Sequence, residues 1–257
     1  MPRKAREKSE TGIYHIILRG NSRQEIFHDD EDFFRFLERL DKYKKASKIK
    51  IHGWCLMNNH VHLLLEEGAE ELSVTMKRIG VSFVWFYNAK YNATGHLFQD
   101  RFKSETIDND KYLMTVIRYI HQNPVKAGLV EKPANWKWSS CSGYYGKHAF
   151  FADLLDSELI LGLFGEDRIT AVRRFIEFNE SANDDNCLEA DLRLRLKDDE
   201  ARCEIKKIME GFELTEIKSL PKEERDEFLA RIKSIEGVTQ RQAARILGIS
   251  PNLIFKS

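Results

Sequence analysis

Residues 49–67 read IKIHGWCLMNNHVHLLLEE, and the fold follows from this stretch. Two runs of strand-forming residues, 49–57 and 60–67, are joined by Asn58-Asn59, a pair able to adopt the positive φ of a tight turn. The three consecutive leucines of the second run are typical of a central, well-packed strand. The stretch therefore predicts a β-hairpin whose second strand lies inside a sheet.

The residues before the hairpin predict a strand followed by a helix. The sequence IYHIILR at 13–19 alternates aliphatic with polar or aromatic residues and stops at Gly20-Asn21, which favours a turn. Residues 29–48 begin with an acidic turn, repeat apolar residues at helical spacing and end in lysines, a charge distribution that suits the helix dipole. A β-α unit thus precedes the hairpin.

After the hairpin the pattern is helix, strand, helix. Residues 71–91 carry a helical apolar stripe, and 97–107 form a short strand after the break at Gly95. Residues 110–122 are helical until Pro124 prevents continuation. The complete order is β-α-β-β-α-β-α.

The first six elements have the order of the ferredoxin-like fold. This α+β fold has four antiparallel strands, with two helices covering one face of the sheet. The seventh element is an added helix. Either this helix or the open face of the sheet must then supply the function.

Two domains are expected. Residues 1–150 form the first, and its last part, from 128, is a turn-rich segment with tryptophans and tyrosines. From about residue 151 the sequence is helical, acidic and poor in strand patterns, so 151–257 is predicted to be an all-helical extension. SANDDN at 181–186 has the composition of a linker.

The last residues, about 237–257, have the composition of a helix-turn-helix. A small apolar face precedes Gly248, which falls in the turn, and Ser250 suits the N-cap of a second short helix. An ordinary helical hairpin that docks on its neighbours is the alternative for this tail.

The composition indicates a globular protein. Hydrophobic residues make up 42% of the 257, and no apolar run approaches the roughly 18 residues needed to cross a bilayer. The start, MPRKAREKSE, lacks the apolar segment of a signal peptide, so a cytoplasmic protein with no membrane partner is expected. The four cysteines lack CxxC or CxH spacing, which argues against a disulfide framework and a cysteine zinc site.

The net charge is zero, but the charges are divided unevenly. Residues 1–150 contain 24 Lys and Arg against 18 Asp and Glu, whereas residues 151–257 contain 17 against 23. The first domain can therefore present a basic face to a polyanion. The acidic balance of the second argues against broad nonspecific affinity for DNA there.

His60 and His62 lie two residues apart in the second strand of the hairpin. Their side chains therefore share one face of the sheet, whereas Val61 points to the other. Two adjacent imidazoles can hold one metal ion, and a packed strand would keep them rigid. Ordinary core or surface histidines are an equally good interpretation of the pair taken alone. A metal would also need a third protein ligand, which for zinc is another His, a Cys or a carboxylate.

The segment RYIHQNPVKAGLV at 118–130 offers such a ligand. Tyr119 and Asn123 are four residues apart and so share a helical face, with the Asn123 amide at the helix end just before Pro124. Two imidazoles and an amide oxygen suit Mg²⁺ or Mn²⁺ and leave positions for phosphate oxygens and water. Tyr119 could then attack phosphorus as a nucleophile. The alternative is a tyrosine with its ring in the core and its hydroxyl at the edge.

Several motifs, in this order, resemble the single-tyrosine transposases of the HUH superfamily, specifically the IS200-like and REP-associated tyrosine transposase group. They are GWCLMNN ahead of HVH, GHLFQDRFKSE, YIHQNPVKAGLV, WKWSS and GYYG, and the match spans roughly residues 11–146. In that family two histidines flanking a hydrophobic residue bind the metal together with an Asn or Gln four residues after the tyrosine. The resemblance therefore implies His60, His62 and Asn123 as metal ligands and Tyr119 as the residue that attacks DNA.

The resemblance also implies an enzyme and its cofactor. Such a transposase binds single-stranded or hairpin DNA, works as a monomer or homodimer, and uses Mg²⁺ or Mn²⁺. It cleaves and rejoins one strand through a 5′-phosphotyrosine intermediate, whose bond energy allows rejoining without ATP. DNA transposition, or nuclease activity at repeated extragenic palindromes, is the implied role. Smaller family members lack the helical extension.

Tyr112 is a rival nucleophile, because it lies seven residues before Tyr119 on nearly the same helical face. Its i+4 residue is Val116, which cannot ligate a metal, so Tyr119 fits the chemistry better. His121 points away from the Tyr119 face and is interpreted as a surface or packing residue.

Five further residues are candidates for DNA contacts. Arg19, Asn21 and Arg23 surround the end of the first strand, where a close backbone approach could meet phosphates or bases. Arg101 and Lys103 alternate with an apolar residue, which would place two cations on one face of a short strand, suited to phosphate contact. A solvated turn and a solvated edge are the alternatives.

Two other functions remain open. A DNA-binding regulator could keep this fold without cutting and use the C-terminal helices for recognition, although the presence of all four site residues argues against it. A zinc hydrolase could use the histidine pair. It would lack an acidic general base nearby, since Glu66 and Glu67 lie at the far end of the strand.

Overall fold

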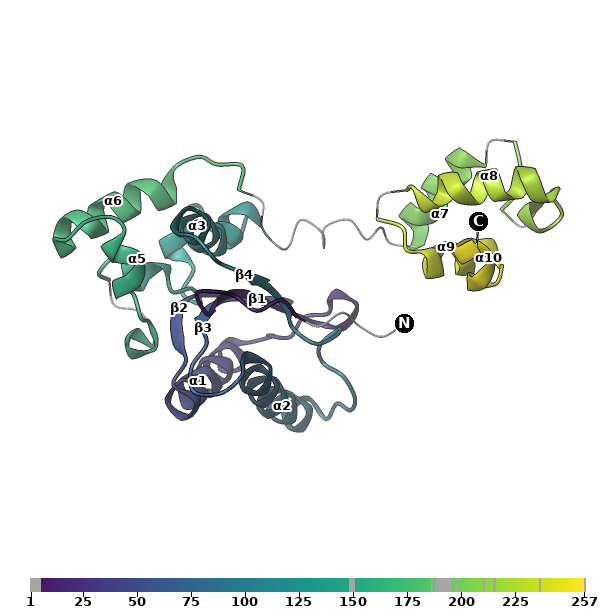
Figure 1. The fold of residues 1–257 in the computed structure, drawn as a ribbon. Helices are drawn as coiled ribbons and strands as arrows, with labels where there is room; N and C mark the ends of the chain where they lie inside the picture. The colour runs from purple at the N-terminus through teal and green to yellow at the C-terminus, as the bar shows by residue number, and fades with distance from the viewer. Residues whose placement is uncertain are drawn as a thin grey trace. The chain divides into compact units, whose positions relative to one another are not determined.

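The computed structural model describes residues 6–147, 151–185, 187, 196, 198–209, 211–214, 216–235 and 237–256. The chain divides into two compact units, Met1–Leu188 and Glu189–Ser257, each with a hydrophobic core of its own (Figure 1). Within the described ranges, no helix is both long and apolar enough to span a membrane.

The first unit is built on a four-stranded antiparallel sheet. Its strands are β1 (Ile13–Arg19), β2 (Lys50–Met57), β3 (His60–Glu66) and β4 (Lys103–Thr106). They lie in the order β2-β3-β1-β4, and each neighbouring pair is antiparallel. This confirms the predicted ferredoxin-like α+β fold, with the leucine-rich β3 in an interior position.

The turn of the β2–β3 hairpin differs from the prediction in its backbone angles. Met57 pairs with His60, so Asn58 and Asn59 form a two-residue connection. Neither is among the described non-glycine residues with positive φ. The Asn58 carbonyl accepts a hydrogen bond from the N–H of Ile26 at 2.7 Å. The turn is thus held by the loop after β1, and the positive φ of an isolated hairpin is not required.

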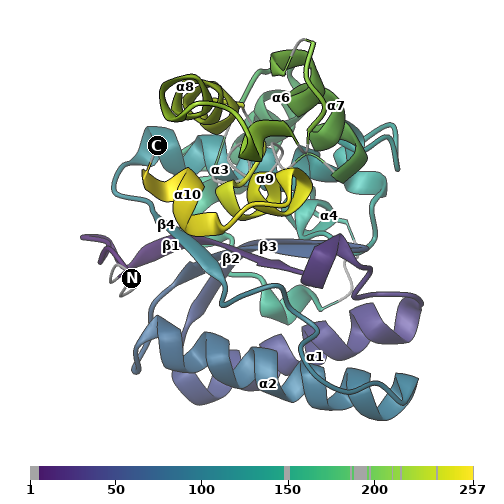
Figure 2. The ribbon, with the colours of Figure 1, turned by 90° about the vertical axis from the view of Figure 1, so that its right-hand side faces the viewer.

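Two helices, α1 (Asp30–Ser47) and α2 (Leu72–Tyr91), cover one face of the sheet (Figures 1 and 2). The acidic residues before and in the first turn of α1 cap the helix. Asp29 accepts a hydrogen bond from the N–H of Asp32, and the Asp32 side chain accepts one from the N–H of Asp29. The sequence pattern of 29–48 therefore encodes both the start of the helix and its apolar face.

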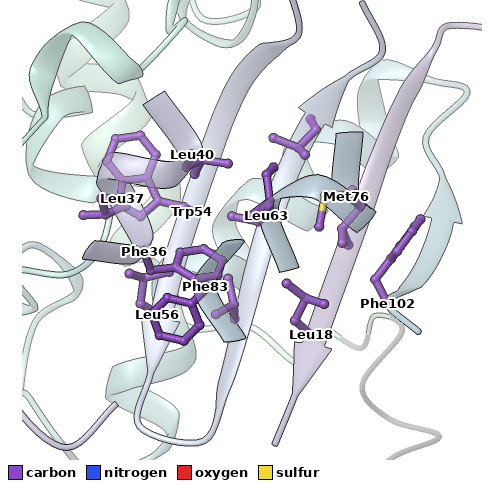
Figure 3. Packing of buried hydrophobic residues seen from close by; sticks show 14 of the residues in the cluster. Leu18, Phe36, Leu37, Leu40, Trp54, Leu56, Leu63, Met76, Phe83 and Phe102 are labelled. Carbon is purple, nitrogen blue, oxygen red and sulfur yellow. The ribbon is translucent and has the colours of Figure 1, made fainter. Parts of the chain in front are cut away.

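The main hydrophobic core lies between this pair of helices and the sheet. Figure 3 shows its side chains, among them Phe36 of α1, Leu63 of β3 and Phe83 of α2, which are fully buried. Burying one such side chain stabilises the fold by roughly 1.5–3 kcal/mol. Packing of α1 and α2 therefore stabilises one face of the sheet. The candidate site residues His60 and His62 lie on the opposite face.

A third helix, α3 (Asp110–Lys126), packs against the opposite face of the sheet, over β2 and β3 (Figure 2). It is the predicted added helix, but it continues through Pro124, so its predicted end before this proline is wrong. Proline removes one helical hydrogen bond. The loss is confined to the last turn, where the N–H of Ala127 still bonds the Asn123 carbonyl at 2.9 Å.

Residues beyond 150 complete the core on the α3 face. Phe175 stacks on Tyr144 with ring centroids 4.6 Å apart, and both are fully buried. The predicted boundary at residue 150 is therefore wrong, because the helix that carries Phe175 supplies side chains to the first unit, which ends at Leu188. Tyr144 ends α4 (Cys141–Tyr144), before residue 150. Beyond residue 150 the helices of the first unit are α5 (Glu158–Gly162) and α6 (Arg168–Glu180), and Phe175 belongs to α6.

The predicted linker at 181–186 is held against α3 over its described part, 181–185. Arg118 forms an ion pair with Asp185, with Nε–Oδ2 at 2.6 Å and Nη2–Oδ1 at 2.9 Å. Lys126 Nζ donates to the Asp185 carbonyl at 3.1 Å. These contacts make the segment part of the first unit.

The strand predicted over 97–107 is limited to β4. The segment before it runs antiparallel beside the end of β1, where Phe98 forms an isolated bridge with Gly20 and the N–H of Gln99 bonds the Arg19 carbonyl at 2.9 Å. Pairing with β1 is interrupted between Phe98 and Lys103, so only four residues of the predicted run form a regular strand.

The second unit consists of helices and connections over its described residues. Buried side chains such as Ile205, Leu229 and Leu247 form its core. Its α-helices are α7 (Asp198–Ile208), α8 (Lys222–Lys233), α9 (Gln240–Leu247) and α10 (Pro251–Lys256). The prediction of an all-helical C-terminal region agrees with these elements.

The connection from α9 to α10 has the predicted turn. Thr239 and Gln242 form a capping box at the start of α9, and Gly248 ends it in the left-handed region at φ 65°. Ser250 directly precedes α10. The two short helices thus have the connectivity of a helix-turn-helix, and their role in DNA recognition stays a prediction.

Candidate active site

His60 and His62 extend from β3 toward α3. Val61 lies in the core under α1 and α2, so the alternation along the strand turns both histidines to the opposite face. Their ring centroids are 4.9 Å apart, with an interplanar angle of 84°. His62 is fully buried and His60 is half-buried, so the two imidazoles form a compact pair below α3.

Tyr119 reaches the same place from α3. Its ring lies 5.7 Å from the ring of His62, at an interplanar angle of 81°, and only 1% of the residue is exposed. Val116 and Ile120 of the same helix are fully buried in the core between α3 and the sheet. This packing brings the candidate nucleophile and the histidine pair together.

Asn123 lies one turn after Tyr119 and is 5% exposed. Its Nδ2 donates to the Tyr119 carbonyl at 3.0 Å, which orients the amide. An amide has one oxygen and one nitrogen, and with the nitrogen donating, Oδ1 is the atom able to ligate a cation. The hydrogen bond thus gives the side chain a defined direction before any ligand is present.

His60, His62 and Asn123 carry donor atoms that could hold a divalent cation. Nδ1 of His60 lies 2.6 Å from Oδ1 of Asn59, and Nδ1 of His62 lies 3.1 Å from Nε2 of His15. With Nδ1 of each ring held in this way, Nε2 is the atom that would ligate. Two imidazole nitrogens and the Asn123 oxygen would be neutral ligands, so a bound cation would keep its full positive charge to attract phosphate.

The sequence reasoning missed two residues of the site, His15 and Glu105. His15 of β1 is fully buried, and its ring stacks on His62 at 5.3 Å and meets the edge of Tyr119 at 6.0 Å. Its Nδ1 lies 3.2 Å from Oε2 of Glu105 on β4. Because β1 lies between β3 and β4, the row crosses three strands. The only sequence signal was the alternation of β1, which does not reveal the strand order.

Tyr112 is bound to the same carboxylate. Its hydroxyl donates to Oε1 of Glu105, and burial together with this hydrogen bond raises the pKa of Tyr112 above its ordinary value. A phenol that is harder to ionise and already committed to a carboxylate is a poor nucleophile. The environment of Tyr112 therefore favours Tyr119 as the attacking residue.

His121 is a packing residue, as one of the two interpretations of the sequence has it. It is fully buried, with Nε2 2.9 Å from Oγ of Ser140, and its ring lies against Tyr144 and Phe175. Burial lowers the pKa of His121 to about 3, so the ring stays neutral at ordinary pH.

Two of the predicted DNA-binding cations lie on the face of the sheet that carries the histidines. Arg19 is the cross-strand partner of His60, and side chains directly opposite each other point the same way. Lys103 is two residues from Glu105 on β4 and therefore shares its face. Lys103 pairs with Ile17, two residues before Arg19, so both cations lie near the same end of β1.

The turn after β1 carries Asn21 and Arg23, both exposed. The close approach of the backbone predicted here is to the chain itself: a Cβ at Gly20 would lie 2.1 Å from the carbonyl oxygen of Gln24. The glycine is thus required by the turn itself.

Arg101 lies on a different surface from Lys103. It lines a groove of about 1080 Å³ between α2 and the segment 95–102, beside the exposed Trp85 and Val81. The prediction that Arg101 and Lys103 share a strand face is therefore wrong, because β4 begins only at Lys103.

Comparison with known proteins defines the class first. Residues 8–123 match the family described as "Transposase IS200 like", a range that contains the whole sheet, His60, His62 and Tyr119 and ends at Asn123. Over these residues the chain is thus similar to transposases of the IS200-like class.

Two relatives identify the family within this class. A REP-associated tyrosine transposase of Escherichia coli K12 is 27% identical over 135 residues, covering 52% of this chain and 77% of the relative. A protein of Haemophilus influenzae assigned to the same group is 30% identical over 149 residues, covering 52% of this chain and 82% of the relative. The chain belongs to the family of REP-associated tyrosine transposases.

A solved structure agrees in fold. The structure of a REP-associated tyrosine transposase bound to a REP hairpin superposes with a TM-score of 0.51 at 20% identity, covering 74% of this chain and 96% of that chain. The chain therefore shares its overall fold with that structure.

Proposed function

We propose that this protein cleaves and rejoins single-stranded DNA at hairpins or palindromic repeats, in a metal-dependent reaction through a 5′-phosphotyrosine intermediate. The observation that carries the proposal is the meeting of Tyr119 with His62 across the α3–sheet interface, with Asn123 one turn further on. Membership of the family and the hairpin bound by the structural relative support the choice of substrate.

The reaction needs a nucleophile, and Tyr119 supplies it. Its phenolic oxygen bonds to the phosphorus, the bond from phosphorus to the 3′-oxygen breaks, and the phenolic proton balances the released 3′-hydroxyl. The 5′-phosphate then remains on Tyr119. Attack by another 3′-hydroxyl reverses these steps and joins a new strand, so no ATP is consumed.

Residues His60, His62 and Asn123 would hold Mg²⁺ or Mn²⁺ beside the phosphate. When bound, the cation polarises the phosphodiester and stabilises the charge that develops on its oxygens. Neighbouring residues orient the side chains that would hold the cation. The Tyr119 carbonyl orients the Asn123 amide, Asn59 orients His60, and His15 orients His62.

The proposed DNA contacts follow from the placement of cations. Arg19 and Lys103 lie on the face of the site and would neutralise phosphates next to the cleaved bond. Asn21 and Arg23, exposed after β1, would contact the adjoining nucleotides. Arg101 would contact the DNA strand from the groove between α2 and the segment 95–102.

A hairpin oligonucleotide with single-stranded flanks tests the proposal directly. With Mn²⁺ present, a fluorophore on the 3′ end should become attached to the protein in a denaturing gel, whereas one on the 5′ end should leave with the released fragment. This polarity follows from a 5′-phosphotyrosine. A protein-linked 5′ label would contradict it.

Two variants identify the attacking residue. Tyr119→Phe should abolish the adduct while hairpin binding persists. Tyr91→Phe is the matched control, because its hydroxyl donates to Asp32 on the other face of the sheet, and it should keep the adduct. Cleavage that survives Tyr119→Phe would overturn the proposal. Tight binding with no adduct from the unmodified protein would favour a DNA-binding regulator instead.

A further inference from the structure

We infer that His15 and Glu105, backed by Tyr112, are positioning residues that set the tautomer and orientation of His62 for metal binding. This deepens the proposed function and rests on its metal site. The carrying observation is a continuous row of hydrogen bonds across three strands and α3. It runs from Tyr112 to Glu105, from Glu105 to His15 and from His15 to His62.

Counting donors along the row gives its direction. A carboxylate only accepts, so Nδ1 of His15 must carry the hydrogen that it shares with Oε2 of Glu105 at 3.2 Å. With the ring neutral, Nε2 of His15 is then an acceptor. The hydrogen of the 3.1 Å contact must therefore sit on Nδ1 of His62.

This hydrogen position determines whether Nε2 of His62 can bind a metal. A neutral imidazole with its hydrogen on Nδ1 has its lone pair on Nε2, which is the form that binds a metal. Without an acceptor at His15 the other tautomer becomes available to His62. A tautomer with hydrogen on Nε2 cannot ligate through that atom.

Orientation is set by the same contacts. The rings of His15 and His62 are stacked at 5.3 Å with 21° between their planes, so His62 cannot rotate without disturbing its neighbour. Glu105 is in turn held from two sides, by His15 at Oε2 and by Tyr112 at Oε1. Such outer partners raise ligand basicity and hold the ring direction in metal sites generally.

The same sheet contains a matched pair that lacks this role. His52 of β2 is also buried, and its Nε2 lies 3.1 Å from Oε2 of Glu66, while its Nδ1 lies 3.0 Å from the Asp156 carbonyl. Glu66 ends β3, whereas His60 begins it. Changes at His52 and Glu66 therefore report the general cost of breaking a buried histidine–glutamate pair.

Mn²⁺ affinity of the full chain without DNA provides the test, measured from the electron paramagnetic resonance signal of free Mn²⁺. His15→Phe and Glu105→Ala should each weaken Mn²⁺ binding about tenfold or more, in the range found when outer partners of metal ligands are removed. His52→Phe and Glu66→Ala should lower the melting temperature without weakening Mn²⁺ binding. Glu105 is partly exposed, so Glu105→Ala offers a folded variant should His15→Phe fail to fold.

The outcomes are distinguishable. If His62→Ala abolishes Mn²⁺ binding while His15→Phe and Glu105→Ala bind as tightly as the unmodified protein, the positioning role is overturned and the metal site stands. If His15→Phe and His52→Phe weaken Mn²⁺ binding equally, the hydrogen bonds from Tyr112 to His62 have only a structural role, and the positioning role is likewise overturned. If His62→Ala leaves Mn²⁺ binding unchanged, the metal site of the proposed function fails, and the positioning role fails with it.

Discussion

The ring of Tyr119 stands nearly perpendicular to the ring of His62, 5.7 Å away, although one residue belongs to α3 and the other to β3. Their meeting depends on how closely α3 approaches the sheet. Gly53 of β2 permits that approach, because a Cβ there would lie 2.4 Å from Cδ1 of the buried Ile117.

Gly53→Ala should therefore displace α3. Overpacking of this kind costs about 1–3 kcal/mol of unfolding free energy, and the yield of the Tyr119 adduct should fall at temperatures where the variant is still folded. Ile117→Val removes the clashing methyl, so the double variant should recover part of both losses. Thermal unfolding and adduct formation measure them. Unchanged stability in Gly53→Ala would contradict this account of the α3 position.

Asn123→Ala should weaken Mn²⁺ binding by more than about tenfold, since it removes a proposed ligand outright. Its neighbour Gln122 provides the matched control, because the Gln122 amide donates to the Asn179 carbonyl at 2.6 Å and belongs to the packing of α3 on α6. Gln122→Ala should affect thermal stability only. Equal Mn²⁺ affinities in the two variants would remove Asn123 from the ligand set.

Asp32→Asn should destabilise the α1–α2 layer by about 1–3 kcal/mol, because the amide nitrogen cannot accept the hydrogen bonds that a buried carboxylate oxygen receives. Asp32 is fully buried and accepts hydrogen bonds from Lys90, Tyr91 and the N–H of His28. Asp30, in the same turn of α1 as Asp32, is exposed and forms an ion pair with Lys137. Asp30→Asn should therefore change stability by less than about 1 kcal/mol. Urea unfolding midpoints compare them, and similar shifts would argue against a special role for Asp32.

The cysteines should differ sharply in their reaction with iodoacetamide. Burial raises the pKa of Cys141 and of Cys187 to about 12, which at pH 8 makes the reactive thiolate roughly a thousandfold rarer than at a thiol with the ordinary value of 9. Cys203 is exposed. Mass spectrometry of the native protein should find Cys203 labelled first, with all four labelled only after denaturation. Early labelling of Cys187 would mean that its surroundings near Tyr112 open readily.

The fragment 1–188 should unfold in one cooperative thermal transition, whereas the fragment 1–150 should not. The shorter fragment loses Phe175, which packs against both Tyr144 and His121. Removing a buried phenylalanine costs about 3–5 kcal/mol even as a single substitution. Circular dichroism on heating distinguishes the two. A cooperative transition in the fragment 1–150 would restore the boundary expected from the composition.

Local patterns predicted most of the elements. The alternation of 13–19, the turn pair Asn58-Asn59 and the helical stripes of 29–48 and 71–91 each agree with the observed strands and helices to within one residue. Such patterns depend on residues that are close together in sequence, so they can be predicted without knowledge of the tertiary structure. The errors arose where contacts between distant segments decide the structure, as at 97–102, where pairing with β1 is reduced to a single bridge at Phe98 and β4 begins only at Lys103.

The sequence by itself determined which groups are present and which way they point along their own elements. His60 and His62 had to share a strand face, and Tyr119 and Asn123 had to share a helix face, because the periods of strand and helix require it. Only the tertiary structure decided that these two faces meet, and that His15 and Glu105 join them. Strand order and helix packing bring together residues from β1, β3, β4 and α3, and spacing along the chain carries no record of which strands become neighbours.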